Sequence, residues 1–394
     1  MKIAIVADVL GEENNGTVVA CMNLIRYLES RGHELHIVCP DESKRGLKGY
    51  YIIPKYSFGI FNKYMNKNGV APAKADYDII REALTGCEVC HILLPFSAGK
   101  VARIVCEQLG IPFTAGFHAQ AENISAHMRM SHFGLLNRKI YKVFYKRLYK
   151  YCDGIHYPTE FIKDTFEHVV GKTNSYVISN GVNARFIKKS VSKPKELEDK
   201  YVILFTGRYA KEKTHKVLIN AVSKSKYSDR IQLIFAGCGP LEKKLKKMSN
   251  KKLKNKAIMN FFSRDEIVDV INYSDLYVHP AEVEIEAISC LEAIKCGLVP
   301  VIANSKKCAT KAFALDNRCL FKNKNAKDLK NKIEYWIEHE EEKKLMEEKY
   351  LDFTLQFDQE KCMEKMEEML IEVSKLNKRP IMYKKNKKRL KEVK

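Results

Sequence analysis

The sequence contains no apolar stretch long enough to span a membrane. A spanning helix needs about 20 consecutive apolar residues, and charged side chains interrupt every apolar run well before that length. The first run, from Ile3 to Ala7, ends at Asp8 and lacks the long apolar region and cleavage site of a secretory signal. It reads as a first β-strand. We therefore expect a cytoplasmic protein, which can still bind peripherally to the inner face of the cell membrane.

A disulfide framework is also absent. The 12 cysteines are scattered, and most lie within apolar segments, as is typical of reduced, buried thiols. One stretch, Cys87 to His91, matches the c-type haem attachment pattern, but it runs directly into a predicted strand and no export signal precedes it. We therefore expect no haem.

Positive charge, by contrast, is abundant and unevenly distributed. Of a net charge of +21, nearly all lies in three segments: residues 138–150 with six Lys or Arg and no acid, residues 242–256 with eight Lys and one Glu, and residues 375–394 with ten Lys or Arg and one Glu. Such charge suits nucleic acid, an anionic membrane or an ordinary basic surface. Zinc-finger spacing, RNA-binding motifs and a basic region leading into heptads are absent, so we expect no nucleic-acid partner.

The first basic segment has helical periodicity. Its side chains form three stripes: an apolar one of Leu136, Ile140, Phe144, Leu148 and Tyr151, a basic one of Lys139, Lys142, Lys146 and Lys150, and a third of Tyr141, Tyr145 and Tyr149. A helix of this kind suits the headgroup layer of an anionic membrane, and an ordinary surface helix of a lysine-rich protein is the alternative. The candidate surface for an acceptor or membrane consists of Lys139, Lys142, Tyr145, Lys146, Arg147 and Lys150.

Short apolar runs alternate with amphipathic stretches along most of the chain, which is typical of βαβ units with a parallel sheet. Two series of such runs flank a polar, lysine-rich segment. We therefore predict an α/β fold with two Rossmann-like domains whose parallel sheets face each other across a cleft. The predicted boundaries are 1–187 for the first domain, 188–200 for the linker, 201–353 for the second domain, 354–374 for a helix crossing back to the first domain, and 375–394 for a disordered basic tail.

Loops that leave strands are the places to look for a site, because ligands of such sheets bind beyond the carboxyl ends of the strands. After the predicted strand at 202–205 come Gly207 and Arg208, and Lys213 stands ahead of the next helix. A glycine turn with two cations before a helix N-terminus suits a diphosphate, although a structural salt bridge explains Arg208 about as well. Gly237 and Gly239 form a second turn, which either admits a ligand to the backbone or is simply tight.

Two acids follow the predicted strand at 276–278. Glu284 lies in the loop that leaves the strand, and Glu292 lies two turns into a helix that otherwise looks buried. A carboxylate on the inner side of a helix needs a partner such as a ribose diol. The alternative is a helix-capping acid and an exposed acid.

In the first domain, Gly16 precedes the first long helix, where the turn either caps the helix or admits a phosphate. His118 follows the predicted strand at 113–117. A lone histidine after a strand is more often structural than catalytic, but its expected position toward the cleft favours a function.

As an ordered set these loops resemble glycosyltransferase family 4, the retaining enzymes of the GT-B fold, over residues 1–372. The motifs that carry the resemblance are Gly207-Arg208, Glu212-Lys213, Gly237-x-Gly239-Pro240, His279-Pro280, Glu284-x7-Glu292-Ala293 and Gly297-x-x-Pro300-Val301, with Asn180-Gly181-Val182 at the end of the first domain. The implied fold is GT-B, and the implied substrate is a nucleotide diphosphate sugar.

The resemblance also implies roles in the second domain. Arg208 and Lys213 would hold the donor diphosphate, Glu284 the sugar hydroxyls and Glu292 the ribose. The glycines at 237 and 239 and the backbone from Ile285 through Glu286 and Ala287 to Ile288 would complete the donor site. This chain departs from the family at one place, where Ile285-Glu286-Ala287 stands for the usual Gly-Phe-Gly.

In the first domain, the resemblance places His118 near the reacting sugar and Gly16 in a loop that approaches donor and acceptor. Transfer in the family retains the anomeric configuration, with a leaving phosphate oxygen accepting the proton of the acceptor, which fits the lack of a convincing protein nucleophile here. Catalysis would then depend on stabilising the departing diphosphate. We expect no metal and no bound cofactor, because no Asp-x-Asp motif was recognised in the sequence.

The lead hypothesis is a retaining hexosyltransferase that uses a nucleotide sugar with a uridine base, such as UDP-glucose. The basic helix is similar to those of membrane-surface relatives that glycosylate diacylglycerol, so a lipid acceptor at the cytoplasmic membrane surface is expected. A transferase for a polyprenyl-linked or soluble saccharide in capsule or cell-wall synthesis is the first alternative. A non-catalytic protein that binds nucleotide sugars or a membrane surface is the second.

Overall fold

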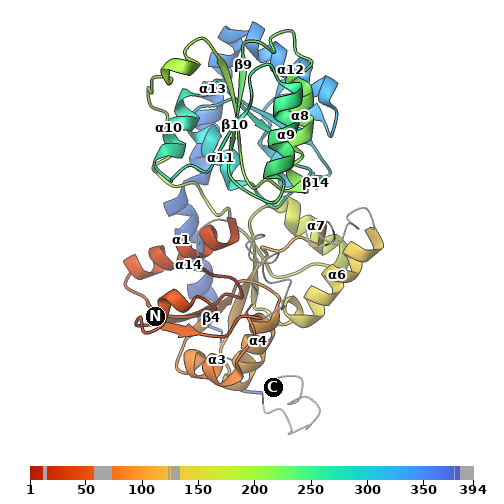
Figure 1. Cartoon of the computed structure of the whole chain (residues 1–394). Helices are drawn as coiled ribbons and strands as arrows, with labels where there is room; N and C mark the ends of the chain where they lie inside the picture. The colour runs from red at the N-terminus through yellow and green to blue at the C-terminus, as the bar shows by residue number, and fades with distance from the viewer. Residues whose placement is uncertain (12–15, 57–72, 123–124, 126–133, 377, 382–394) are drawn as a thin grey trace. The chain divides into compact units, whose positions relative to one another are not determined.

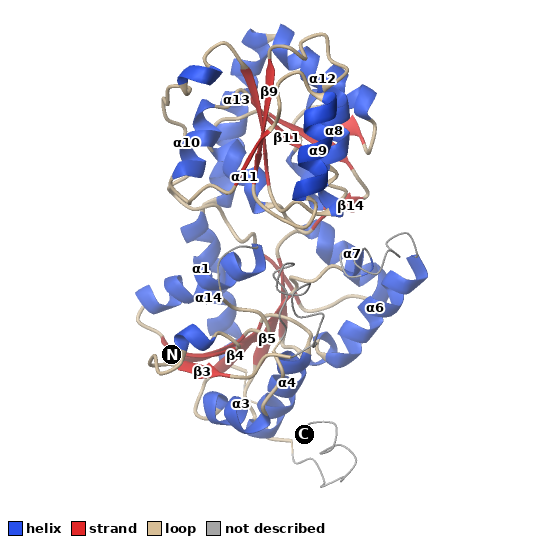
Figure 2. Ribbon diagram, viewed as in Figure 1, coloured by secondary structure: helices blue, strands red, loops and turns tan. Residues whose placement is uncertain are grey.

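The computed structural model describes residues 1–11, 16–56, 73–122, 125, 134–376 and 378–381. Contacts between residues divide the chain into two compact units. Unit 1 combines Met1–Asn180 with Glu360–Lys394, and unit 2 is Gly181–Gln359. Each unit contains one parallel sheet with helices on both faces, as Figure 1 and Figure 2 show.

Unit 1 contains a seven-stranded parallel sheet in the order β3-β2-β1-β4-β5-β6-β7. The strands are β1 (Lys2–Val6), β2 (Glu34–Cys39), β3 (Tyr50–Ile52), β4 (Val89–Ile92), β5 (Phe113–Gly116), β6 (Gly154–Tyr157) and β7 (Ser175–Val177). In the register, Ile3 lies opposite Leu35 on one side and Val89 on the other. The central strands are buried on both faces, which explains their nearly continuous apolar sequences.

The helices of unit 1 connect these strands. They are α1 (Gly16–Ser30), α3 (Tyr77–Leu84), α4 (Ser97–Leu109), α6 (Gly134–Arg147) and α7 (Glu160–Val170), with 3-10 turns η1 (Glu42–Lys44) and η3 (Tyr149–Tyr151). Local sequence sets where several of them begin. Thr159, for example, accepts a hydrogen bond from the backbone N–H of Ile162 at the start of α7.

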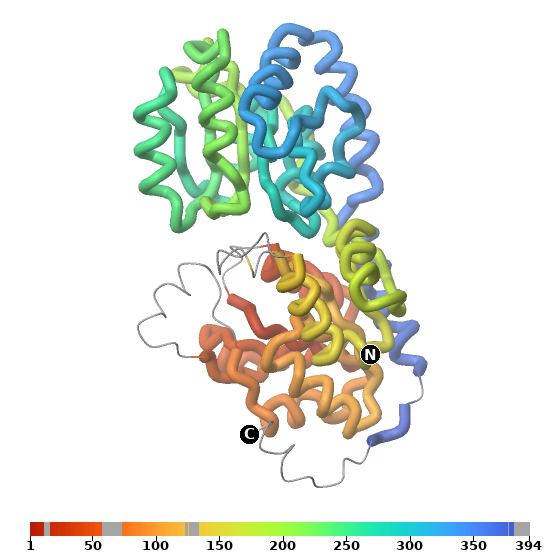
Figure 3. The backbone as a smooth tube through the Cα atoms, turned by 90° about the vertical axis from the view of Figure 1, so that its right-hand side faces the viewer, coloured from red at the N-terminus to blue at the C-terminus, as the bar shows by residue number. Residues whose placement is uncertain are grey.

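The last helix, α14 (Gln359–Ser374), completes the core of unit 1 although it follows unit 2 in the sequence. Met363, Met366 and Leu370 pack in one apolar cluster with Leu24 and Leu28 of α1. Figure 3 shows this blue helix lying along unit 1. We predicted one helix from residue 354, but the chain there passes through a 3-10 turn, η8 (Leu355–Phe357), before α14 begins.

Unit 2 contains a six-stranded parallel sheet in the order β10-β9-β8-β11-β13-β15, and a separate pair, β12 with β14. The strands are β8 (Tyr201–Thr206), β9 (Ile231–Ala236), β10 (Ile258–Asn260), β11 (Leu276–His279), β12 (Val283–Glu284), β13 (Pro300–Asn304), β14 (Lys307–Cys308) and β15 (Leu320–Lys322). β12 follows β11 in the chain and β14 follows β13, and their pairing fixes the backbone at Glu284 opposite Cys308.

The helices of unit 2 cover both faces of its sheet. They are α8 (His215–Val222), α9 (Glu242–Lys252), α10 (Glu266–Tyr273), α11 (Ile288–Lys295), α12 (Ala326–Glu338) and α13 (Glu340–Thr354), with 3-10 turns η4 (Lys195–Leu197), η5 (Lys211–Lys213), η6 (Ala309–Phe313) and η7 (Asn317–Cys319). Their apolar faces bury Trp336, Tyr277 and Tyr350 completely in the core of the unit.

The α/β class and the two parallel sheets are confirmed. The domain limits at 187, 200 and 353, and the cleft between the sheets, stay predictions. Ten of the 12 cysteines are buried, and Cys238 is the exposed one. Across the described residues, no helix is both long and apolar enough to cross a membrane.

Candidate active site

Two glycine turns lie against each other at the carboxyl ends of β8 and β9. The backbone N–H of Tyr209 donates to the carbonyl of Cys238 at 2.8 Å, so the two turns are joined directly. A Cβ on Gly237 would overlap the carbonyl oxygen of Gly207, and one on Gly239 would lie 2.7 Å from the backbone nitrogen of Tyr209. The glycines are therefore needed for the contact between the turns, whatever their further role.

The two cations beside these turns each contact a carboxylate. Nη2 of Arg208 donates to Oε1 of Glu212 at 3.3 Å, and Nζ of Lys213 forms an ion pair with Oε1 of Glu284. The Lys213 and Glu284 side chains are 17% and 13% exposed, so this pair is largely removed from water. Burial alone would raise the pKa of Glu284, but the charge of Lys213 and contacts from His279 outweigh it and hold the pKa at about 2.

A chain of buried polar side chains continues from Glu284 into the core of unit 2. Nε2 of His279 lies 3.3 Å from Oε1 of Glu284, without the alignment of a hydrogen bond. Its Nδ1 lies 3.2 Å from the hydroxyl of Tyr277, which lies 3.0 Å from Oγ1 of Thr206. Burial lowers the pKa of His279, so the ring is neutral near pH 7. In the sequence His279 stands out only as part of a motif, and Tyr277 and Thr206 do not stand out at all, because both lie within apolar strand segments.

The segment that departs from the family pattern leads from Glu284 into α11. Ala287 has a left-handed backbone with φ of 65°, a conformation that costs a residue with a Cβ about 1–2 kcal/mol and that glycine adopts freely. Glu286 is 4% exposed, so its side chain points away from solvent. The backbone of Ile285 to Ile288 therefore keeps a glycine-like turn without a glycine.

Glu292 lies on α11 and is half-buried. Burial raises its pKa to about 7, while Arg264 and Arg185 lower it by a smaller amount through their charges. A carboxylate in such surroundings gains by hydrogen bonding to a polar ligand, as the ribose role requires. The geometry brings Lys213 and Glu284 together but pairs Glu292 with neither of them.

In unit 1, His118 lies just beyond the carboxyl end of β5 and is half-buried. Its ring rests directly on the backbone of Gly116, where a Cβ would lie 2.6 Å from both Cδ2 and Nε2 of the ring. Loss of water, together with the nearby rings of His156 and His91, holds the pKa of His118 well below its usual range. The side chain is therefore an uncharged imidazole at neutral pH.

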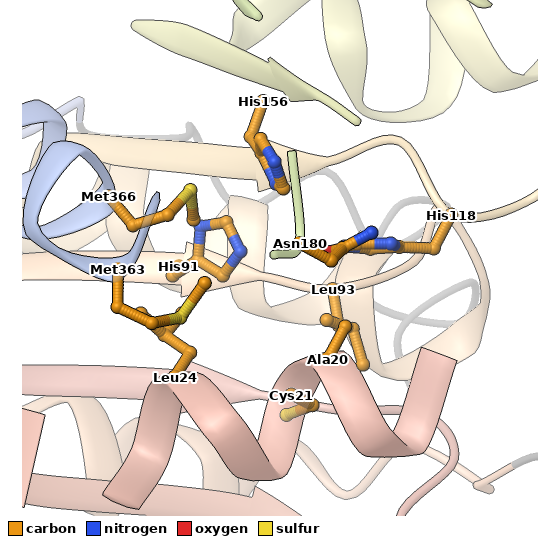
Figure 4. Close-up of a pocket in the computed structure, with 10 residues that line it drawn as sticks. All are labelled: Ala20, Cys21, Leu24, His91, Leu93, His118, His156, Asn180, Met363 and Met366. Atoms are coloured by element: carbon orange, nitrogen blue, oxygen red, sulfur yellow. The ribbon is translucent and has the colours of Figure 1, made fainter. Parts of the chain in front are cut away.

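Two further histidines accompany His118, and sequence analysis did not predict either as a site residue. The ring centroid of His156 lies 5.5 Å from that of His118 and 6.4 Å from that of His91. All three rings line a cavity of about 10 Å³ inside unit 1, together with Asn180 (Figure 4). One signal was available: His91 and His156 are polar residues near the carboxyl ends of otherwise apolar strands.

Gly16 is the first residue of α1, and a Cβ there would meet no described atom within 4 Å. Asp8, which we did not single out, is fully buried and accepts hydrogen bonds from the backbone N–H groups of Ala98 and Gly99 at 2.9 and 3.2 Å. Burial raises its pKa to about 7, and those two hydrogen bonds offset part of the shift. Asp8 thus caps the N-terminus of α4, although it lies far from that helix in the sequence. The residues before Gly16, at 12–15, lie outside the described residues.

The basic helix α6 differs from the predicted pattern. Tyr141 and Tyr149 do not form a surface stripe but pack against Phe117 and Phe166, because their rings fill the space over the end of the sheet. Tyr145 is half-buried. The exposed side chains of α6 are those of Leu135, Val143 and the cations Arg138, Lys139, Lys142, Lys146 and Arg147, and a sixth exposed cation, Lys150, lies in η3.

One Asp-x-Asp sequence does occur, at Asp76 to Asp78, outside the candidate loops. Oδ1 of Asp76 accepts hydrogen bonds from the backbone N–H groups of Asp78 and Ile79, both at 3.1 Å, so it caps α3. Within the described ranges, no three His, Cys, Asp or Glu side chains gather as metal ligands. Metal-independent transfer stays a prediction.

Two parallel α/β sheets, each with polar residues gathered at the carboxyl ends of its strands, give this chain the GT-B fold of its structural neighbours. The profile described as Glycosyltransferase Family 4 matches residues 14–186, and the profile described as Glycosyl transferases group 1 matches residues 186–350. The chain belongs to glycosyltransferase family 4 and is a retaining hexosyltransferase.

Curated relatives share about a quarter of their residues with this chain. An alpha-monoglucosyldiacylglycerol synthase of Acholeplasma laidlawii is 23% identical, over 84% of this chain and 87% of the relative. A GDP-mannose-dependent alpha-mannosyltransferase of Corynebacterium glutamicum is 24% identical, over 77% of this chain and 72% of the relative. The first relative is named for a glucosylated lipid and the second for a GDP-mannose donor.

Solved structures agree on the fold. Anabaena HepE in complex with UDP-glucose has a TM-score of 0.74 and 16% identity, covering 94% of this chain and 100% of HepE. WaaG, a glycosyltransferase involved in lipopolysaccharide biosynthesis, has a TM-score of 0.66 and 15% identity, covering 93% of this chain and 99% of WaaG.

Proposed function

We propose that the protein transfers glucose from UDP-glucose to the hydroxyl of a membrane lipid such as diacylglycerol, on the inner face of the cell membrane. The observation that carries the lipid part is the exposed basic face of α6 in unit 1. Relatives named as glucosyldiacylglycerol synthases, from two organisms, support the same acceptor class. HepE, which was crystallised with UDP-glucose, supports the donor.

The positive charges of Arg208 and Lys213 suit them to bind the diphosphate of the donor. A diphosphate is an anion that can replace the carboxylates now paired with Arg208 and Lys213. When Lys213 turns to the diphosphate, Oε1 of Glu284 is released to accept hydrogen bonds from the sugar hydroxyls. We assign the binding of the ribose to Glu292. The donor would also lie close to the backbone of Gly237 and Gly239 and to the amides of residues 285–288.

The chemistry needs little covalent participation by the protein. Stabilising the negative charge that develops on the departing diphosphate lowers the barrier, and a phosphate oxygen accepts the proton of the attacking lipid hydroxyl on the same face of the sugar. His118, held neutral by its surroundings, hydrogen-bonds the reacting sugar without competing for the phosphate. The loop that Gly16 begins contributes to the approach of donor and acceptor.

The face of α6 fits an anionic lipid surface in two respects. Its cations face solvent without an acid among residues 134–150, and two apolar side chains stand among them, with Leu135 85% and Val143 44% exposed. Cations bind the phosphate headgroups while apolar side chains enter the layer beneath. Exposure of Leu135 to water brings no stabilisation, whereas its entry into a lipid layer would.

Co-sedimentation with vesicles of phosphatidylcholine, with and without phosphatidylglycerol, tests this surface. Each lysine near an anionic membrane contributes about 1 kcal/mol. The combined change Lys139→Gln, Lys142→Gln and Lys146→Gln should therefore weaken binding to the anionic vesicles about a hundredfold. Added salt should weaken binding by the wild type as well.

A matched control lies on α9 of unit 2, where Lys243, Lys246 and Lys247 are equally exposed. Changing these three to Gln removes the same charge and should leave most of the binding intact. Binding that ignores phosphatidylglycerol or salt would contradict the membrane role. Equal losses in both triple variants would show that total charge, rather than α6, is responsible.

A further inference from the structure

A row of three buried polar side chains stands behind Glu284 in unit 2. Tyr277 and His279 lie two residues apart on β11, so they point to the same face of the sheet. Thr206 ends the neighbouring strand, β8. All three side chains are buried, so their polar atoms depend on one another and on nearby protein groups for hydrogen bonds.

The carboxylate of Glu284 determines the direction of hydrogen bonding along this row. Its pKa is about 2, so it is ionised at neutral pH and can only accept hydrogen bonds. Nε2 of His279 lies 3.3 Å from Oε1 of Glu284. A bare nitrogen there would set two lone pairs against each other, so Nε2 carries the hydrogen. Burial lowers the pKa of His279 and keeps the ring neutral, so its other nitrogen, Nδ1, has no hydrogen.

Two hydroxyl groups complete the row. Nδ1 of His279 lies 3.2 Å from the hydroxyl of Tyr277, which therefore donates to it. The hydroxyl oxygen of Tyr277 can then accept from Oγ1 of Thr206, 3.0 Å away. All three donors thus point toward Glu284, and hydrogen bonds in such a chain strengthen one another. The tautomer of His279 is set by the carboxylate, which can only accept, and not by a hydroxyl, which can do both.

Lys213 and His279 approach the same oxygen of Glu284. Nζ of Lys213 forms an ion pair with Oε1, and the N–H of His279 is close to Oε1 without being aligned for a hydrogen bond. In the proposed donor complex Lys213 turns to the diphosphate. A buried carboxylate that loses its partner is strongly destabilised. Among the described residues, His279 is the remaining basic side chain within 4 Å of this carboxylate.

We propose that His279 is a positioning residue for the donor: when Lys213 binds the diphosphate, the Nε2–H of His279 becomes the hydrogen-bond donor that keeps Glu284 ionised and in place. The proposal rests on the proposed function, in which Lys213 binds the diphosphate and Glu284 the sugar. Each carboxylate oxygen has two lone pairs, so Oε1 can accept from His279 and from a sugar hydroxyl together. An uncharged donor suits this place, because a second cation would compete with Lys213 for the diphosphate.

Calorimetric titration with UDP tests this exchange of partners. His279→Leu removes the donor and keeps an apolar side chain, so UDP binding would leave Glu284 buried without a partner. Because a hydrogen bond to a charged group changes an equilibrium about tenfold or more, we expect the Kd for UDP to rise about tenfold. His279→Gln carries an N–H near the place of Nε2 and should restore most of the affinity. No recovery in His279→Gln would overturn the proposal.

Two controls isolate the pairing with Glu284. In a Glu284→Gln background the carboxylate is absent, so His279→Leu should change the Kd for UDP less than about twofold. His215→Leu is the matched variant, because His215 is another buried histidine beside Phe205 and has no hydrogen-bond partner among the described residues. Equal losses of affinity in both Glu284 backgrounds, or at His215 and His279, would overturn the proposal.

Two further readouts separate this proposal from the proposed function. Inorganic pyrophosphate carries two phosphates without base or sugar. The same dependence of its Kd on His279, in a protein that transfers no glucose, would support the proposal and contradict the proposed function. Nitrogen NMR of protein labelled with 15N-histidine needs no ligand. The ring of His279, assigned by its loss in His279→Gln, should be the neutral tautomer with its hydrogen on Nε2, and a hydrogen on Nδ1 would overturn the proposal.

Discussion

Unit 1 and unit 2 both place polar side chains at the carboxyl ends of central parallel strands, but with opposite chemistry. In unit 1 the side chains are His91, His118 and His156, whose pKa values burial holds below the usual range, so the cluster is uncharged at neutral pH. In unit 2 opposite charges are paired, with Lys213 against Glu284 and Arg208 against Glu212.

This difference matches the two parts of a nucleotide sugar. A charged diphosphate can replace a carboxylate beside an arginine or lysine, so the paired charges of unit 2 provide exchangeable contacts for it. A cluster of neutral imidazoles offers no net charge to a phosphate, but it can hydrogen-bond an uncharged hydroxyl. Under the proposed function, the paired charges of unit 2 suit the diphosphate of the donor, and the neutral rings of unit 1 suit an uncharged hydroxyl.

The largest effect should come from breaking the charge pairing of unit 2. Lys213→Met removes a cation from the diphosphate and leaves Glu284 without its ion-pair partner. Loss of one such contact to the developing charge costs about 100- to 1000-fold in rate, so kcat/KM for UDP-glucose should fall by that amount. Lys211→Met is the matched control, because Lys211 is exposed on the same 3-10 turn. Equal losses at both positions would contradict the assignment.

The two sites should also lose stability in different pH windows. His156 has a pKa of about 4 in the folded chain against 6.5 ordinarily. The unfolded chain therefore binds more protons between these values, and the stability from this residue is complete above pH 6.5 and lost as the pH falls toward 4. Glu284 shifts from 4.5 to about 2, so its contribution is complete above pH 4.5 and lost toward pH 2.

Hydrogen exchange of peptides covering β6 and β12 can measure these windows. The free energy of opening, measured by exchange, should differ between wild type and His156→Gln by an amount that changes between pH 4 and 6.5, by up to about 3 kcal/mol. For Glu284→Gln, the difference from wild type in the free energy of opening should change only below pH 4.5. A common window for both variants would contradict the contrast between a neutral and a charged site.

A smaller effect is expected from Gly116→Ala in unit 1. The new Cβ would lie 2.6 Å from the ring of His118, so the ring must move by a fraction of an ångström or more. Misplacement of a group at a reacting centre lowers the rate, and we expect kcat to fall about 10- to 30-fold while the donor KM changes little. Steady-state kinetics with saturating acceptor will show this, and an unchanged kcat would argue that His118 does not contact the sugar.

The smallest effect concerns the left-handed residue of unit 2. Ala287→Gly should stabilise unit 2 by about 0.5–1 kcal/mol, because glycine adopts a φ of 65° without strain. Ala293→Gly, within the same helix, should destabilise it by about 1 kcal/mol. Urea unfolding of both variants gives the comparison, and destabilisation by Ala287→Gly would show that the Cβ of Ala287 makes a needed contact.

Much of this organisation is predictable from the sequence. The apolar runs at 3–7, 113–117, 202–205 and 276–278 correctly predicted β1, β5, β8 and β11, because strands buried on both faces leave a clear signal. The glycine turns, Lys213, Glu284 and Glu292 were singled out because together they form an ordered set of motifs, and their donor-binding roles stay predictions. Short elements such as β12 and β14 were missed, since two residues carry no periodicity.

What the sequence could not provide is which polar side chains meet. The pairing of Lys213 with Glu284, the contact of Tyr277 with His279, and the convergence of His91 and His156 on His118 all join positions far apart in the chain or hidden in apolar strands. The tyrosines of α6 were misassigned for a related reason. Spacing predicts a face, but the large rings of Phe117 and Phe166 decide which face is buried.

The most direct test of the central claim is an intact-mass analysis of products from several donors and acceptors. UDP-glucose, UDP-galactose and GDP-mannose would each be offered with diacylglycerol, a sterol and a polyprenyl-linked saccharide in vesicles containing phosphatidylglycerol. We predict that UDP-glucose adds the mass of one hexose to a membrane lipid, diacylglycerol before the others, and that the Lys213→Met variant does not form this product. Hexose added only to the polyprenyl-linked saccharide, or to no acceptor with any donor, would contradict it.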